Sequence, residues 1–212
     1  MAVQFQSAVK AIAGACLVVM VNHGVAAIAA EKGGVEDKIE YCQICHGQAG
    51  QGYHGYLTMP RLAGQQPAYL ESQLRDYADG RRVNSVMSNV ARGVSPSMYG
   101  AIAAHFRALN PPPLNGGAGG DAALGRTIFA NGLPESNVPA CSACHGPDGH
   151  GTGQIPRLAG QVPSYLVKTL SNWGPERGRA SAGGLSAIMV PTTHNMTAAQ
   201  IAAVAAYVGS LR

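Results

Sequence analysis

Residues 42–47 read CQICHG and residues 141–146 read CSACHG. Each segment holds a C-x-x-C pair followed at once by histidine. On a helical turn, this spacing lets both thiols reach the vinyl groups of one porphyrin and sets the histidine against its iron. The sequence therefore predicts two covalently bound haem c groups. The attachment residues would be Cys42, Cys45, Cys141 and Cys144, with His46 and His145 as axial ligands.

Other chemistry also uses paired cysteines. Two C-x-x-C pairs are compatible with a four-cysteine zinc site, and one pair is compatible with a thioredoxin-like redox centre. Zinc does not require a histidine after each pair, and a thioredoxin fold needs a βαβ context that the sequence lacks. Neither alternative explains why the segments around the two motifs are also similar, so haem is the favoured interpretation.

The chain consists of two similar halves, which form an internal repeat. PRLAGQ occupies residues 60–65 and occurs again at residues 156–161, after the second motif. The halves also end alike, with AIAAHF at 101–106 and AVAAYV at 203–208. Residues 110–120 (NPPPLNGGAGG) lie between the halves, and their prolines and glycines predict a linker. The predicted division is a signal peptide at 1–29, an N-terminal domain at 30–109, this linker, and a C-terminal domain at 121–212.

The N-terminus has the pattern of an export signal. Lys10 supplies positive charge, residues 11–21 are apolar, and Ala27-Ile28-Ala29 has the A-x-A cleavage pattern. We therefore expect a periplasmic protein, with retention of this segment as a membrane anchor left open as the alternative.

The coarse secondary structure is all-α, because no alternating strand pattern is present. Thr197 and Gln200 form a capping box that opens a helix through Leu211, and Ser95 with Pro96 opens another through Leu109. Further helices are expected at 67–79, 121–130 and 163–173, with a short one leading into Cys42. Each domain is predicted to be a few short helices around one haem.

The repeat also indicates the second axial ligands. Of the methionines in the mature part, only Met87 and Met189 occupy equivalent positions, each in a loop before the last helix of its half. A thioether ligand raises the reduction potential and closes the iron to small molecules. We therefore predict His46/Met87 and His145/Met189 ligation. The histidines His54, His105, His150 and His194 are the competitors, with His194 the strongest.

Two repeated residue pairs are expected to support the cofactor. The carbonyls of Pro60 and Pro156 are placed to accept from the ring N–H of His46 and His145, which would orient each imidazole. Arg61 and Arg157 are predicted to pair with haem propionates.

Composition and charge limit the classes of function that the sequence supports. The 212 residues carry a formal net charge of +4, and charged residues make up 12%. Because the Lys and Arg residues are scattered, no nucleic-acid surface is predicted.

Taken together, CQICHG, CSACHG, the two PRLAGQ segments, Met87 and Met189 resemble the dihaem cytochrome c4 family. The resemblance implies two tandem class I cytochrome c domains related by a pseudo-twofold axis. It also implies a periplasmic electron carrier, loosely membrane-associated, between a quinol-cytochrome c reductase or similar donor and a terminal oxidase. The alternatives are the dihaem subunit of a dehydrogenase, such as a flavoprotein sulfide dehydrogenase, and an enzyme such as a thiosulfate dehydrogenase or peroxidase.

Overall fold

The computed structural model describes residues 34–114, 119–177 and 185–212. The chain divides into two units, Met1–Lys38 and Ile39–Arg212. Only residues 34–38 of the first unit are described, and they are helical. The signal peptide predicted at 1–29 therefore lies outside the described residues. In the part that is described, no helix is both long and apolar enough to cross a membrane.

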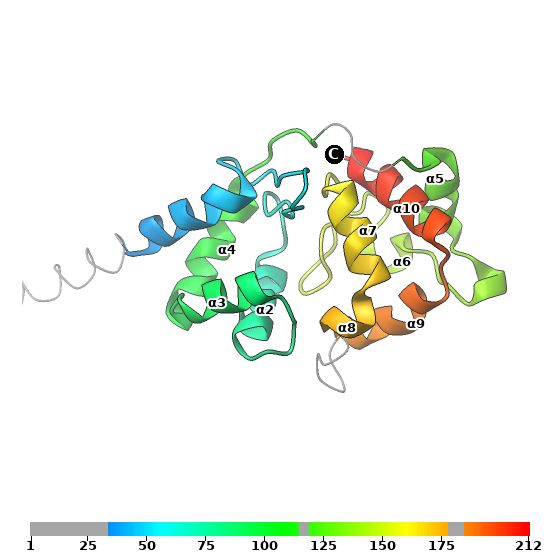
Figure 1. The fold of residues 1–212 in the computed structure, drawn as a ribbon. Coiled ribbons are helices and arrows are strands. Elements are labelled where there is room, and N and C mark those ends of the chain that lie inside the picture. Colours follow the sequence, from blue (N-terminus) through cyan, green and yellow to red (C-terminus); the bar gives the residue numbers. More distant parts are fainter. Residues whose placement is uncertain (1–33, 115–118, 178–184) are drawn as a thin grey trace, which may run out of the picture. The chain divides into compact units, whose positions relative to one another are not determined.

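The first repeat of the second unit is helical. Residues 39–46 are helical and end in the first haem motif. The helices that follow are α2 (Pro67–Ala78), α3 (Ser85–Arg92), the 3-10 turn η1 (Pro96–Met98) and α4 (Tyr99–Ala108). Helix α2 packs against both α3 and α4 (Figure 1). Tyr99 and Phe106 of α4 are fully buried and form the centre of this half.

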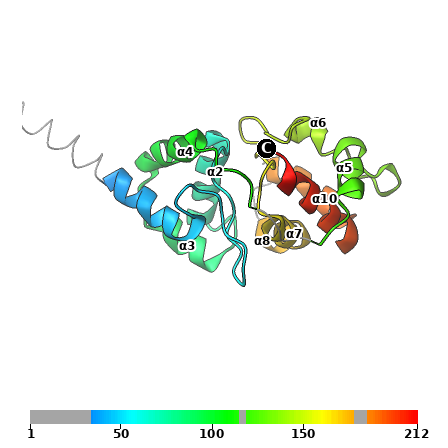
Figure 2. The ribbon, with the colours of Figure 1, turned by 90° about the horizontal axis from the view of Figure 1, so that it is seen from above.

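The second repeat has more helices, several of them a single turn or little more. They are α5 (Ala122–Asn131), η2 (Pro134–Ser136), α6 (Ser142–His145), α7 (Pro163–Ser171), α8 (Trp173–Arg177), η3 (Leu185–Ile188), α9 (Met189–His194) and α10 (Ala198–Ser210). Helix α10 packs against α5 and α7, and Figures 1 and 2 both show α10 beside α5. Ile128 and Phe129 of α5 pack with Val204 and Val208 of α10 in one apolar cluster. The described residues of both repeats contain isolated β-bridges but no strand, so the all-α prediction is confirmed.

Helix α10 begins as predicted. The Thr197 side chain accepts from the backbone N–H of Gln200, and the Gln200 side chain accepts from the backbone N–H of Thr197. Its crossing with α5 depends on Gly125, where a Cβ would collide with the backbone of Ala203. The close approach of these two helices therefore requires glycine at this position.

One local prediction is right only in its start, and another is wrong. Ser95 and Pro96 begin a helical segment as predicted, but its first turn is the 3-10 turn η1, α4 begins at Tyr99, and the Ser95 hydroxyl contacts Ser97 rather than capping a helix. The predicted loops that carry Met87 and Met189 are helices α3 and α9. In α3 the reason is Asn84, whose side chain accepts from the backbone N–H of Met87 at 3.0 Å and so caps the helix.

Candidate functional site

Each motif histidine is held by a proline carbonyl. His46 Nδ1 lies 2.8 Å from Pro60 O, and His145 Nδ1 lies 2.9 Å from Pro156 O. A carbonyl only accepts, so Nδ1 carries the ring proton and Nε2 keeps its lone pair. Both side chains are buried, and burial lowers the pKa of each imidazole against the smaller opposing effect of this hydrogen bond. Each site thus presents a neutral imidazole whose Nε2 is available to a metal.

The loop after each motif sets this geometry. The N–H of Gly52 donates to His46 O and the N–H of Gly151 to His145 O, each at 2.8 Å. Gly52 has φ +86°, and a Cβ there would lie 2.8 Å from Met59 O and from the backbone N of Arg61. Only glycine fits this turn, which brings the PRLAGQ segment back onto the histidine. The sequence repeat predicts the same turn in the second half, where Gly151 has φ +64°.

The motif cysteines lie at the ends of the helices that carry the histidines. Cys45 and Cys144 are exposed, whereas Cys141 packs against the apolar cluster, and burial raises the pKa of its thiol to about 11. Cys45, Cys141 and Cys144 are not in disulfides. Among the described residues, which include all four motif cysteines, no group of three or more His, Cys, Asp or Glu is able to hold a metal. The four-cysteine zinc alternative therefore has no site in this structure.

The other candidate ligands are spread over the fold. Met87 is the third residue of α3 and Met189 the first residue of α9. Met196 packs against the apolar cluster, which gives it a structural role. His54 and His194 are exposed, and His150 Nε2 donates to Arg212 O at 2.8 Å. The axial roles of Met87 and Met189 remain predictions.

Large apolar side chains are exposed beside both methionines. Val86 directly precedes Met87 and is 60% exposed, and Ile188 directly precedes Met189 and is 59% exposed. In the first motif Ile44 is also exposed. Apolar surface repeated at equivalent positions fits a flat apolar group that covers it in both halves.

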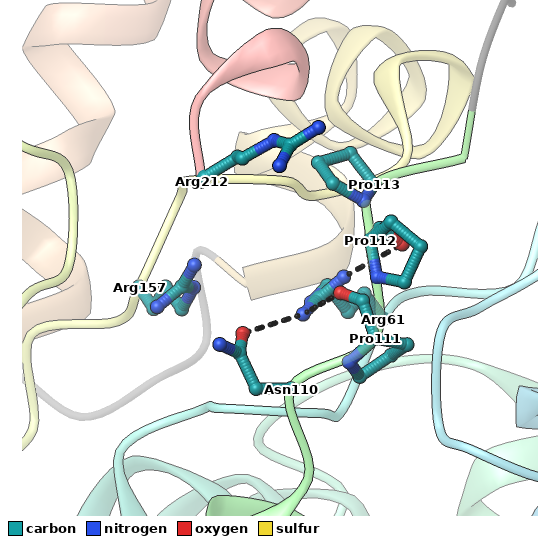
Figure 3. Close-up of a pocket in the computed structure, with 7 residues that line it drawn as sticks. All are labelled: Arg61, Asn110, Pro111, Pro112, Pro113, Arg157 and Arg212. Carbon is teal, nitrogen blue, oxygen red and sulfur yellow. Dashed lines mark hydrogen bonds between the residues drawn. The ribbon is translucent and has the colours of Figure 1, made fainter.

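Arg61 and Arg157 line a cavity of about 210 Å³ with Arg212 and the linker segment 110–113 (Figure 3). The Arg61 guanidinium donates to Ala63 O at 3.0 Å and to Pro111 O at 2.8 Å. Burial, with a smaller effect of the Arg157 cation, lowers the pKa of Arg61 to about 10. Among the described residues, no acidic side chain lines this cavity. The carbonyls of Ala63 and of the linker therefore use much of the donor capacity of Arg61, and its pairing with a propionate remains a prediction.

A second pair of buried arginines is absent from the sequence prediction. Arg82 lies over the Tyr77 ring and Arg177 over the Trp173 ring, each with 4.4 Å from the guanidinium carbon to the ring centroid. Both donate to the Tyr165 hydroxyl, at 2.8 and 3.1 Å respectively. The signal available in sequence was that Tyr77 and Trp173 are equivalent in the repeat and each precedes an arginine by four or five residues.

The cluster of Arg82, Arg177 and Tyr165 offers more hydrogen-bond donors than its described neighbours accept. Arg82 and Arg177 are 6% and 5% exposed, and the Nε–H of each is buried without a hydrogen-bond partner in the described structure. Burial raises the pKa of the Tyr165 phenol, but Arg82 and Arg177 outweigh it and lower the pKa to about 8. Buried cations with spare donors fit a carboxylate ligand, which a haem brings as its propionates. The residues present therefore fit a haem at its iron, at its apolar faces and at its carboxylates.

Comparison with known proteins agrees with this chemistry. Residues 122–212 match the family model for cytochrome c. The chain is 35% identical to cytochrome c4 of Thiocapsa roseopersicina over 175 residues, which cover 80% of this chain and 86% of that one. It is 36% identical to the thiosulfate dehydrogenase electron acceptor of Thiomonas intermedia, over 80% of this chain and 77% of that one. The solved cytochrome c4 of Acidithiobacillus ferrooxidans gives a TM-score of 0.67 at 36% identity, over 80% of this chain and 98% of that one.

Proposed function

This chain belongs to the cytochrome c4 family of dihaem electron-transfer proteins, and from that premise we propose that it shuttles electrons in the periplasm. The donor would be a quinol-oxidising complex or another redox protein, and the acceptor a terminal oxidase. The family carries two haem c groups per chain. Export rests on the signal-like pattern of residues 1–29, and covalent haem would be matured after export.

We assign one haem to each repeat, in domains spanning residues 30–109 and 121–212. Cys42 and Cys45 would bind the first haem, and Cys141 and Cys144 the second. The axial pairs would be His46/Met87 and His145/Met189. The observation that carries this assignment is the matching environment of the two histidines, each with Nδ1 bonded to a proline carbonyl and Nε2 left to the iron.

The arginines would hold the haem carboxylates. Arg82 and Arg177 are favoured because each keeps a buried Nε–H that has no hydrogen-bond partner among the described residues. Arg157 also has donors available, because its Nε donates to Ala159 O while its terminal nitrogens have no hydrogen bond to the described residues. Neutralising buried guanidinium groups by carboxylates would remove an energetic cost of the fold.

The chemistry supplied by a bound haem is one-electron transfer through the iron. The protein's own part is to keep both axial positions filled, so that the iron exchanges electrons without binding substrate. Two such centres in one chain give capacity for two electrons. The expected role is therefore that of a carrier rather than an enzyme.

Carbon monoxide tests the carrier role. Ferrous protein with closed His/Met sites should not bind carbon monoxide readily at either haem. Rapid binding at one haem would contradict methionine ligation there and would favour an enzyme such as a thiosulfate dehydrogenase.

A second candidate function is supported by several of the comparisons. A relative at 36% identity is named a thiosulfate dehydrogenase electron acceptor. On this alternative, the chain would accept electrons from a dehydrogenase partner, such as a thiosulfate dehydrogenase or a flavoprotein sulfide dehydrogenase. Purification from the native membrane and periplasmic fractions distinguishes the two, because a dedicated acceptor should co-purify with its dehydrogenase and a free shuttle should not.

A further inference from the structure

Each repeat contributes a glutamine that binds the peptide group holding the motif histidine of the other repeat. In the first repeat, the peptide between Pro60 and Arg61 accepts from His46 at its carbonyl, 2.8 Å away. The N–H of that same peptide donates to Gln161 Oε1 of the second repeat at 2.7 Å. One peptide group therefore joins the first histidine to a side chain of the other repeat.

The second repeat has the reciprocal arrangement. The peptide between Pro156 and Arg157 accepts from His145 at 2.9 Å, and its N–H donates to Gln65 Oε1 at 2.7 Å. Gln65 and Gln161 each end a PRLAGQ segment, so equivalent residues make equivalent contacts in both directions. This is the pattern of an isologous interface.

Both amides are fixed in orientation. Gln161 Nε2 donates to Arg61 O and Gln65 Nε2 donates to Arg157 O, each at 3.0 Å. Each Oε1 also accepts a second backbone N–H, from Val162 and Gln66 respectively, at 2.9 Å. Exchanging oxygen and nitrogen would set the NH₂ group against two N–H donors, which excludes the flipped amide. Gln65 is 4% exposed and Gln161 is 6% exposed, so water does not compete for these bonds.

The physical consequence follows from peptide conjugation. An acceptor at the N–H increases electron density on the carbonyl oxygen of the same peptide, because the C–N bond has partial double-bond character. Hydrogen bonds in series strengthen one another in a buried environment. A stronger acceptor at Nδ1–H makes the imidazole more basic, and a more basic axial ligand favours ferric iron.

We propose that Gln161 tunes the haem of the first repeat and Gln65 tunes the haem of the second, each through the proline carbonyl that orients the opposite repeat's histidine. The two glutamines are positioning residues, and each haem's potential depends on the docking of the other half. This inference rests on the proposed axial roles of His46 and His145.

The test is a crossed shift in reduction potential. Gln161→Met removes the acceptor and should raise the potential of the first haem, leaving the second unchanged. Gln65→Met should raise the potential of the second haem and leave the first unchanged. We expect the ferrous-to-ferric ratio at the wild-type midpoint to change about threefold, or about 28 mV, since tenfold corresponds to about 59 mV for one electron. A Met189→His background displaces the potential of the second haem and so identifies each centre.

Two further variants separate tuning from structural damage. Gln161→Glu retains an acceptor for the Arg61 N–H and should return the first potential to the wild-type value or below it. Gln66→Met is the matched control, because the Gln66 side chain donates to His150 O and Gly151 O at 2.9 Å and to neither of the peptides that hold His46 and His145. The backbone N–H of residue 66, which donates to Gln65 Oε1, is kept in this variant. Gln66→Met should leave both potentials unchanged. The ¹⁵N-edited resonance of the axial His46 Nδ1–H should move upfield in Gln161→Met alone.

The outcomes are distinct. A shift at the haem of the mutated repeat, equal shifts at both haems, or no shift would overturn the proposal. If Gln161→Met does not fold, the sign of the Gln161→Glu shift decides, and a rise in the first potential would overturn it. Failure of the proposed function would appear instead in the wild-type protein, as fewer than two haems or an absent sulfur-to-iron band.

Discussion

At the residue scale, the two methionines proposed as ligands differ from the other methionines in position rather than in chemistry. Met189 begins α9, next to the exposed Ile188, whereas Met196 packs into the apolar cluster of the second repeat. Equivalence in the repeat was enough to select Met87 and Met189 from the sequence. Their helices escaped prediction, because α3 depends on an Asn84 cap and α9 is only six residues long.

Met189→Ala should open the second haem and leave the first closed. The reduction potential of that haem should fall, because the thioether favours ferrous iron. The ferrous protein should bind carbon monoxide at one haem of the two, and the far-red sulfur-to-iron band should drop by about half. Met196→Leu is the control; it should keep the band and lose less than about 1.5 kcal/mol of stability. If the band has the same intensity in Met189→Ala as in the wild type, the Met189 sulfur does not contribute to it. Another residue, first of all His194, would then be the ligand.

Tyr165 reports whether haem carboxylates reach Arg82 and Arg177. In their absence the two arginines lower the pKa of the phenol to about 8. Carboxylates on the same guanidinium groups would offset this effect, so in the haem-loaded protein Tyr165 should keep its proton through pH 8. A pH titration of ring-labelled tyrosine resonances, assigned with Tyr165→Phe, measures this.

If no carboxylate reaches the two arginines, the stability of the fold depends on pH in a defined direction. A phenol that titrates at about 8 in the folded protein, against about 10 when unfolded, would stabilise the fold fully above pH 10. That contribution would be lost as the pH falls through 8. A difference in unfolding free energy between wild type and Tyr165→Phe that grows from pH 8 to pH 10 would therefore show that no haem carboxylate offsets the charges of Arg82 and Arg177.

At the element scale, the crossing of α5 and α10 depends on the absence of a side chain at Gly125. A Cβ at Gly125 would collide with the Ala203 backbone and lie 2.8 Å from Tyr207 Cβ. Gly125→Ala should therefore lower the free energy of unfolding of the second repeat by about 1–3 kcal/mol. Gly119→Ala, before α5, is the control, because its φ is not positive and, beyond its chain neighbours, no described atom lies within 4 Å of its Cβ; it should change the free energy of unfolding by less than about 1 kcal/mol. Denaturant unfolding checks both, and equal effects would refute the packing role of Gly125.

Local signals account for which elements the sequence could predict. The capping box of Thr197 and Gln200 marks the start of α10 because its two hydrogen bonds are made within four residues. The Ser95-Pro96 pair carries a similar local signal, but it opens a 3-10 turn, and α4 begins only at Tyr99. Local patterns thus locate helices better than they fix their first turn.

At the scale of the whole molecule, the repeat predicts that two halves are built alike but not which faces meet. The bond of Gln161 to the Arg61 peptide and that of Gln65 to the Arg157 peptide become visible only when the halves are docked. The Arg82–Arg177–Tyr165 cluster joins residues of both halves in the same way. In sequence these residues are scattered polar positions, because long-range pairing leaves no periodic pattern.

We propose that each repeat holds one His/Met-ligated haem c. A redox titration of the mature protein, followed through its haem absorption and its far-red sulfur-to-iron band, tests it most directly. We expect two one-electron steps per chain, with both haems contributing to the band in the ferric protein. A single step from one haem, or a band that accounts for only one of two haems, would contradict the claim.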